Sequence, residues 1–85
     1  MTPPKPAPTL DLHGYKLDDA ESAVDEFLYK HNNAGTGKIR IMTGKGTGAI
    51  RDKVIKYLQQ GGFPWSYEKL PNGQPNQGVL VVHLE

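Results

Sequence analysis

The chain has 85 residues, no cysteine and a formal net charge of +1. A domain of this size buries only about 60% of the surface that its unfolded chain exposes, which excludes a second domain and leaves one thin core with one site. Without cysteine the chain has neither a disulfide framework nor a thiolate metal site. This composition fits a reducing compartment and makes the cytoplasm the expected location.

The N-terminal sequence MTPPKPAPT is rich in proline and lacks the apolar segment of a signal peptide. We interpret residues 1–8 as an extended proline-rich linker or tail, with the folded domain over residues 9–85. A linker implies that further chain precedes it. No apolar run approaches the roughly 20 residues that span a bilayer, so we expect no membrane association.

A first strand is predicted from residue 9, where the sequence reads TLDLHG. Because side chains alternate between the two faces of a strand, Leu10 and Leu12 share one face, and Asp11 and His13 share the other. Histidine transfers protons near neutral pH, and a neighbouring carboxylate can orient it or hold a divalent metal ion. An exposed edge strand with a polar face explains the same spacing.

A helix is predicted over residues 19–33. Asp18 and Glu21 resemble a capping box, and apolar residues follow them at helical spacing until Gly35 ends the helix. The next segment, Lys38–Met42, alternates between polar and apolar residues and predicts a second strand. These elements form a β-α-β unit.

A glycine-rich loop, TGKGTG at residues 43–48, separates the second strand from a second predicted helix. In this helix Ile50, Val54 and Leu58 recur at helical spacing, and Gly61 closes it. The loop therefore lies between the end of a strand and the start of a helix.

Two further strands complete the predicted domain. Residues 65–70 alternate and carry polar side chains, which is typical of an edge strand, whereas residues 78–84 are apolar on both faces and predict an interior strand. The sequence PNGQPNQG, residues 71–78, is interpreted as a polar connection between them.

The order β-α-β-α-β-β predicts an α/β fold with a mixed four-stranded sheet. Right-handed crossovers place both helices on one face of that sheet, which gives a two-layer α+β sandwich.

The carboxyl ends of the first two strands should meet at one edge of the sheet, where ligands of open α/β sheets usually bind. His13 and the glycine-rich loop should therefore lie together. The free N–H groups of a helix that starts near Gly48 form a phosphate site, and Lys45 and Arg51 add positive charge. The loop matches neither a Walker motif nor a dinucleotide fingerprint, so we expect no nucleotide cofactor. A tight turn without a ligand would also explain the glycines.

Two of these segments together resemble the signatures of the small MutS-related (Smr) domain. Residues 10–14, LDLHG, match its strand-end motif, and residues 43–46, TGKG, match its loop motif. Residues 48–51, GAIR, and residues 78–84, GVLVVHL, resemble its later segments. The resemblance covers nearly all of the chain from Thr9 onward. It implies a fold similar to the C-terminal domain of bacterial translation initiation factor three.

The resemblance also implies nucleic-acid binding and, in many members, endonuclease activity, either nicking of DNA or cleavage of messenger RNA on stalled ribosomes. By position, the acidic and histidine residues of the family correspond to Asp11 and His13. Its loop glycines correspond to Gly44 and Gly46, and its helix-start arginine corresponds to Arg51. Such domains often end a larger MutS-like ATPase, so this chain is expected to be attached to, or cut from, a longer one.

The leading hypothesis is an endonuclease module in which the glycines from Gly44 to Gly48 hold a phosphate. Lys45 and Arg51 stabilise developing charge, His13 transfers the proton, and Asp11 orients His13 or binds a metal ion. RNA would supply its own 2′-hydroxyl as the nucleophile, whereas DNA would need an attacking water and favours magnesium or manganese. No cofactor is obligatory from the sequence.

Two alternatives come from different functional classes. The first is a non-catalytic module of a larger MutS-like protein that binds nucleic acid or the ribosome through the same edge. The second is a protein-interaction domain in which Asp11 and His13 make contacts unrelated to phosphate. Tyr15 lies next to the predicted site and is a candidate for stacking on a base.

Overall fold

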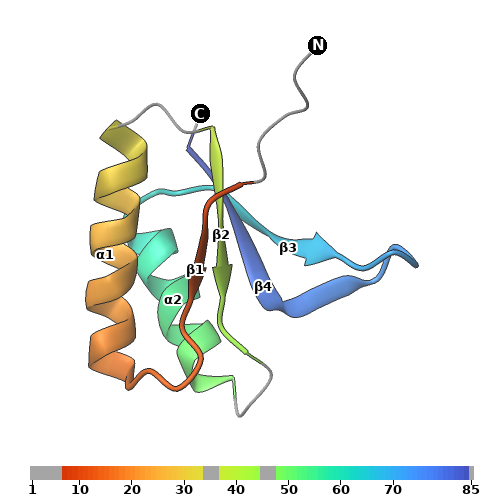
Figure 1. Ribbon diagram of the computed structural model, residues 1–85, viewed down its shortest axis with the longest axis horizontal. Coiled ribbons are helices and arrows are strands. Elements are labelled where there is room, and N and C mark those ends of the chain that lie inside the picture. Colours follow the sequence, from red (N-terminus) through yellow and green to blue (C-terminus); the bar gives the residue numbers. More distant parts are fainter. Residues whose placement is uncertain (1–6, 34–36, 45–47, 85) are drawn as a thin grey trace.

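The computed structural model describes residues 7–33, 37–44 and 48–84. Figure 1 shows a four-stranded sheet with both helices packed on the same face, which confirms the predicted two-layer α/β fold. No helix in these ranges is long and apolar enough to cross a membrane. The elements are β1 (Thr9–Asp11), α1 (Leu17–Asn33), β2 (Lys38–Met42), α2 (Ala49–Gln60), β3 (Trp65–Lys69) and β4 (Pro75–His83).

The strands lie in the order β1-β2-β4-β3. β1 pairs with β2 in parallel, and β4 runs antiparallel to both of its neighbours, so the sheet is mixed as predicted. The last strand is interior and β3 forms an edge. The apolar character of β4 follows from this position, because an interior strand covered by helices exposes little of its surface.

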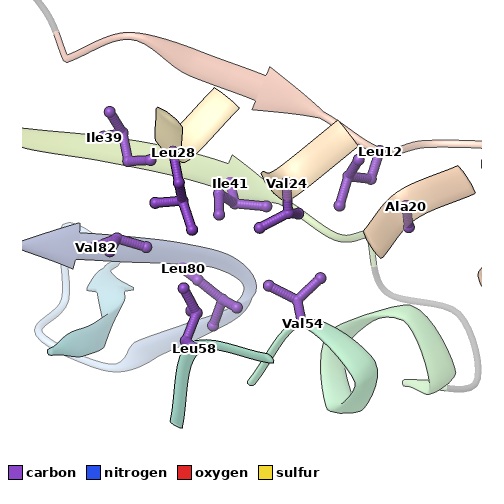
Figure 2. Close-up of a cluster of buried hydrophobic side chains, with 10 residues drawn as sticks. All are labelled: Leu12, Ala20, Val24, Leu28, Ile39, Ile41, Val54, Leu58, Leu80 and Val82. Carbon is purple, nitrogen blue, oxygen red and sulfur yellow. The ribbon is translucent and has the colours of Figure 1, made fainter. Parts of the chain in front are cut away.

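The core lies between the sheet and the two helices (Figure 2). Fully burying one aliphatic side chain contributes roughly 1.5–3 kcal/mol, so these contacts fix how the strands and helices are placed. Both helices and the two interior strands β2 and β4 contribute buried side chains, and so does the residue just after β1. They are Leu12, Ala20, Val24, Leu28, Ile39, Ile41, Val54, Leu58, Leu80 and Val82.

The start of the chain departs from the prediction in two places. β1 ends at Asp11 instead of continuing to His13, because the Asp11 carboxylate accepts a hydrogen bond from the His13 main-chain N–H at 2.9 Å and turns the chain. α1 begins at Leu17, so Asp18 lies inside the first helical turn and not ahead of it. The predicted tail, residues 1–8, falls mostly outside the described residues.

The last strand is longer than predicted. β4 begins at Pro75, so half of the predicted polar connection is strand, and β3 and β4 form a hairpin with a short turn between them. Within this hairpin Tyr67 pairs with Leu80, but the next residue, Glu68, pairs with Asn76. Residues 77–79 are therefore an irregular bulge that bends β4.

The two helices contact each other through polar side chains as well as through the core. The Tyr57 hydroxyl of α2 donates a hydrogen bond to the Asp25 carboxylate of α1, and Lys53 pairs with Glu21 at 3.1 Å. Burial, this hydrogen bond and the negative charges of Asp25 and Glu21 raise the pKa of Tyr57 to about 12. The folded chain is therefore more stable with the Tyr57 phenol neutral than with it ionised.

This contact predicts a loss of stability at high pH. The folded-state pKa of Tyr57 lies above the ordinary tyrosine value of 10.0, so its contribution to stability is complete below pH 10 and disappears as the pH rises towards 12. In an absorbance titration of the tyrosines, Tyr57→Phe should lack the component near pH 12, and its stability should fall less over this range. Tyr29→Phe, at a residue 74% exposed, is the control and should keep that component. An unchanged titration in Tyr57→Phe would contradict this assignment.

Candidate functional site

The ends of β1 and β2 lie side by side at one edge of the sheet, together with the start of α2 (Figure 1). Asp11 pairs with Met42, and the main-chain N–H of Leu12 donates to the Met42 carbonyl at 2.9 Å. This parallel pairing places the turn at His13 beside the first residues of the glycine-rich loop.

Asp11 and His13 are both exposed at this edge. The hydrogen bond of the Asp11 carboxylate goes to the His13 main chain, and Tyr15 closes the turn by donating its N–H to the Leu12 carbonyl at 3.0 Å. Gly14 has φ +80°, a conformation that other residues adopt only with strain. Asp11 therefore positions His13 through the backbone, and Tyr15, 43% exposed, follows within the same turn.

The glycine-rich loop is anchored where it leaves β2. The N–H groups of Thr43 and Gly44 both donate to the Gly78 carbonyl in the bulge of β4, at 2.8 and 3.4 Å. The Thr43 hydroxyl lies 3.5 Å from the same oxygen, and Thr43 is buried. The bulge thus fixes the beginning of the loop. Lys45 and Gly46, two of the predicted phosphate ligands, lie outside the described residues.

The loop ends at Gly48, which is the N-cap of α2 and has φ +83°. No side chain caps this helix terminus. Arg51 folds back over Gly48 so closely that a Cβ atom on Gly48 would lie 2.7 Å from the Arg51 Nη2 atom. Its Nη1 atom donates to Gln77 Oε1 at 3.2 Å, and its Nε atom lies 3.5 Å from Asp52 Oδ1. Arg51 therefore joins the start of α2 to the bulge of β4.

These contacts border a cleft of about 400 Å³, which we call the hairpin cleft. Gly44, Gly48 and Arg51 line one side, and Leu70 and residues 75–78 line the other. The sequence analysis identified the first side but missed the second. A glycine inside a strand can mark a bulge, so Gly78 was the available signal.

Asp11 and His13 do not line the hairpin cleft. Because the strand order is β1-β2-β4, the residues that follow β2 have the Asp11–His13 turn on one side and the bulge of β4 on the other. The site thus has three parts in a row: a turn that carries the carboxylate and the imidazole, the start of the glycine-rich loop, and the cleft.

The donor groups limit how a metal ion would be held. In the described ranges, no three His, Cys, Asp or Glu residues are grouped so that they could hold a metal ion. Asp11 and His13 offer one carboxylate and one imidazole at this edge. Mg²⁺ in phosphate sites is commonly held by one or two carboxylates together with waters and substrate phosphates. Asp11 therefore fits an ion held mainly by its substrate, and does not fit a dedicated protein cage.

Residues 10–85 match the family model of the Smr domain. The chain belongs to the Smr domain family. Among curated proteins it is similar to Endonuclease MutS2 of Ligilactobacillus salivarius, with 34% identity over 79 residues, which are 93% of this chain and 10% of that protein. It is also similar to Endonuclease MutS2 of Caldanaerobacter subterraneus, with 32% identity over 78 residues, 92% of this chain and 10% of that protein. This Smr chain spans about a tenth of the length of these relatives.

Two solved structures have the same fold as this Smr chain. The Smr domain of Thermus thermophilus MutS2 has a TM-score of 0.79 and 32% identity, over 93% of this chain and 99% of that one. YdaL, a stand-alone small MutS-related protein from Escherichia coli, has a TM-score of 0.78 and 20% identity, over 91% of this chain and 63% of that one. The likeness to YdaL concerns the fold alone.

The close approach of Arg51 to Gly48 predicts that Gly48→Ala disturbs the site. Alanine is strained at a positive φ by about 1–2 kcal/mol, and its methyl group would displace the guanidinium from Gln77. The matched control is Gly62→Ala, because Gly62 has φ +73° and open space around it.

Both variants should lose free energy of unfolding, but only Gly48→Ala should shift the side-chain NMR signals of Arg51 and Gln77. Equal shifts in the two variants would show that the contact is not specific to Gly48.

Proposed function

We propose that this edge of the sheet binds nucleic acid and cleaves a phosphodiester bond beside His13. The observation that carries the proposal is the parallel pairing of β1 and β2, which brings the Asp11–His13 turn next to the anchored start of the glycine-rich loop. A proton-transfer group and a phosphate-binding loop thus share one surface. The name Endonuclease MutS2, carried by relatives, supports the same chemistry.

The phosphate would lie on the glycine-rich loop, from Gly44 to Gly48, and at the start of α2. Helix N-termini favour anions because the positive end of the helix dipole lies there. Arg51 is held over Gly48, where its charge would stabilise the pentacovalent phosphorus. Lys45 and Gly46 complete the proposed set of phosphate ligands.

His13 would transfer the proton. Its side chain is exposed, and its main chain is fixed by Asp11, so the imidazole can reach a bound phosphodiester without competing for a buried partner. With RNA, His13 would take the proton of the 2′-hydroxyl, which attacks the adjacent phosphorus. The bond from phosphorus to the 5′-oxygen then breaks, the 5′-oxygen leaves as a hydroxyl after taking up a proton, and a 2′,3′-cyclic phosphate forms. With DNA, a water would attack the phosphorus, one of its two ester bonds would break, and the departing oxygen would leave as a hydroxyl; magnesium or manganese would lower the pKa of the water.

A non-catalytic binding module is the second candidate. The observation in its favour is that the Asp11 carboxylate bonds the main chain of His13 and not the imidazole. With this bond Asp11 has a structural role, which is to shape the turn, and this role requires no part in a reaction. In that case the same edge would grip phosphates, in free nucleic acid or on a ribosome, for a longer MutS-like protein. An attached chain would raise the effective concentration of a weak site in either case.

The deciding experiment is cleavage of supercoiled DNA and single-stranded RNA, with and without magnesium or manganese. His13→Ala should reduce cleavage by about 100-fold or more, the usual size of a general acid–base contribution, and should leave binding unchanged. His83→Ala is the matched control, because His83 is also an exposed histidine but pairs with Lys38 at the opposite end of the sheet. It should cut as the wild type does.

Undiminished cutting by His13→Ala would contradict catalysis by this residue. Binding without any cutting by the wild type would favour the non-catalytic module. Asp11→Asn keeps an acceptor for the His13 main-chain N–H, so a loss of cutting in this variant that metal concentration restores would identify Asp11 as a metal ligand.

A further inference from the structure

The structure points to the hairpin cleft as a subsite for a nucleobase: we infer that it receives the unpaired base of a nucleotide next to the phosphate on the glycine-rich loop. This inference rests on the proposed function, since it assumes nucleic acid at this edge. It names the substrate class as nucleic acid with an unpaired nucleotide. A base in this cleft must come from a single strand or from a nucleotide turned out of its duplex.

The size and position of the hairpin cleft suit a base. Its volume of about 400 Å³ lies at the lower end of the range of roughly 300–1,000 Å³ that small-molecule sites occupy. Gly44 and Gly48, the two described glycines of the glycine-rich loop, line the hairpin cleft. A nucleotide whose phosphate lies on the loop would therefore have its base within reach of the cleft.

The walls of the hairpin cleft offer surfaces on which a base can pack. Leu70 is 38% exposed although it is apolar, and Pro75 beside it is also exposed. Arg51 lines the other side, with its guanidinium held by Gln77. Planar guanidinium groups stack on nucleobases, and apolar side chains cover the second face of a base.

Two amide side chains can read the edge of that base. Asn76 Oδ1 accepts a hydrogen bond from the Gly78 N–H at 3.1 Å, and Gln77 Oε1 accepts one from Arg51 at 3.2 Å. With their oxygens engaged, these side chains present NH₂ donors. Every base has ring-nitrogen or carbonyl acceptors along its edges, so the hairpin cleft is equipped to bind bases that present an acceptor.

The wall formed by the hairpin is held by hydrogen bonds within the protein. Leu70 donates to the Gln74 carbonyl at 2.8 Å, Gly73 donates to the Leu70 carbonyl at 2.9 Å, and the Gln74 N–H donates to Asn72 Oδ1 at 2.9 Å. The bulge behind it is fixed by the bonds from Thr43 and Gly44 to Gly78. A preformed cleft loses little conformational entropy on binding.

The test is a set of short single-stranded RNA oligonucleotides, each with one abasic position, bound to the protein and followed by fluorescence anisotropy. For the wild type, one position should stand out, where removal of the base weakens binding about fivefold or more, as for a lost stacking contact. Leu70→Ala should weaken binding of the intact oligonucleotide. In this variant, removal of the base at the sensitive position should no longer change the affinity. Gln77→Ala, which removes an amide from the same wall, should act in the same direction.

The control is Tyr29→Ala, at an exposed aromatic residue of α1, which should keep the wild-type pattern of sensitivity. The inference is overturned if no abasic position stands out, if the sensitive position persists in Leu70→Ala and Gln77→Ala, or if blunt duplex binds as tightly as single strand. These readouts need no cleavage. Cutting that depends on His13 without any sensitive base would remove the subsite and leave the proposed function intact. A sensitive base without cutting would leave the subsite and nucleic-acid binding and would remove the cleavage.

Discussion

The parallel pairing of β1 with β2 is the constraint on which the rest of the site depends. It is a short pairing, from Thr9 to Asp11, continued by the bond from Leu12 to the Met42 carbonyl. Because both strands end at the same edge, the turn at His13 and the start of the glycine-rich loop become neighbours although about 30 residues separate them. The buried face of β2 and the helix α1 hold this pairing in place through the core.

The bulge of β4 is the second determinant, and it acts on the other side of the glycine-rich loop. The Gly78 carbonyl accepts both anchoring hydrogen bonds of the loop, and Gln77 next to it accepts the bond from Arg51. One irregular segment thus fixes the beginning of the loop and the arginine at its end. The bond from Thr43 to the Gly78 carbonyl continues the pairing of β2 with β4 beyond Met42 and Val79, whereas Gln77 accepts through its side chain. This segment of β4 therefore shapes the surface on which we propose that phosphate binds.

The elements specified by local sequence were predicted well. Alternation located Lys38–Met42, helical spacing located the second helix, and the two motifs identified the family and the fold. Three features were not predicted. The end of β1 is set by the local hydrogen bond between Asp11 and His13. The early start of β4 and the bulge are set by the pairing of β4 with β3. The second wall of the hairpin cleft depends on that bulge, for which Gly78 within the strand is the signal in the sequence. The assigned roles of Asp11, His13 and the glycines stay predictions.

The most direct measurement is an NMR titration of the isotopically labelled protein with a short single-stranded oligonucleotide, following the main-chain amide signals. If nucleic acid binds at this edge, the largest shifts will fall on His13, Gly44, Gly48 and Arg51, because their N–H groups lie at the carboxyl ends of β1 and β2 and at the start of α2. Shifts concentrated at the opposite end of the sheet, around Lys38 and its partner His83, would contradict the account.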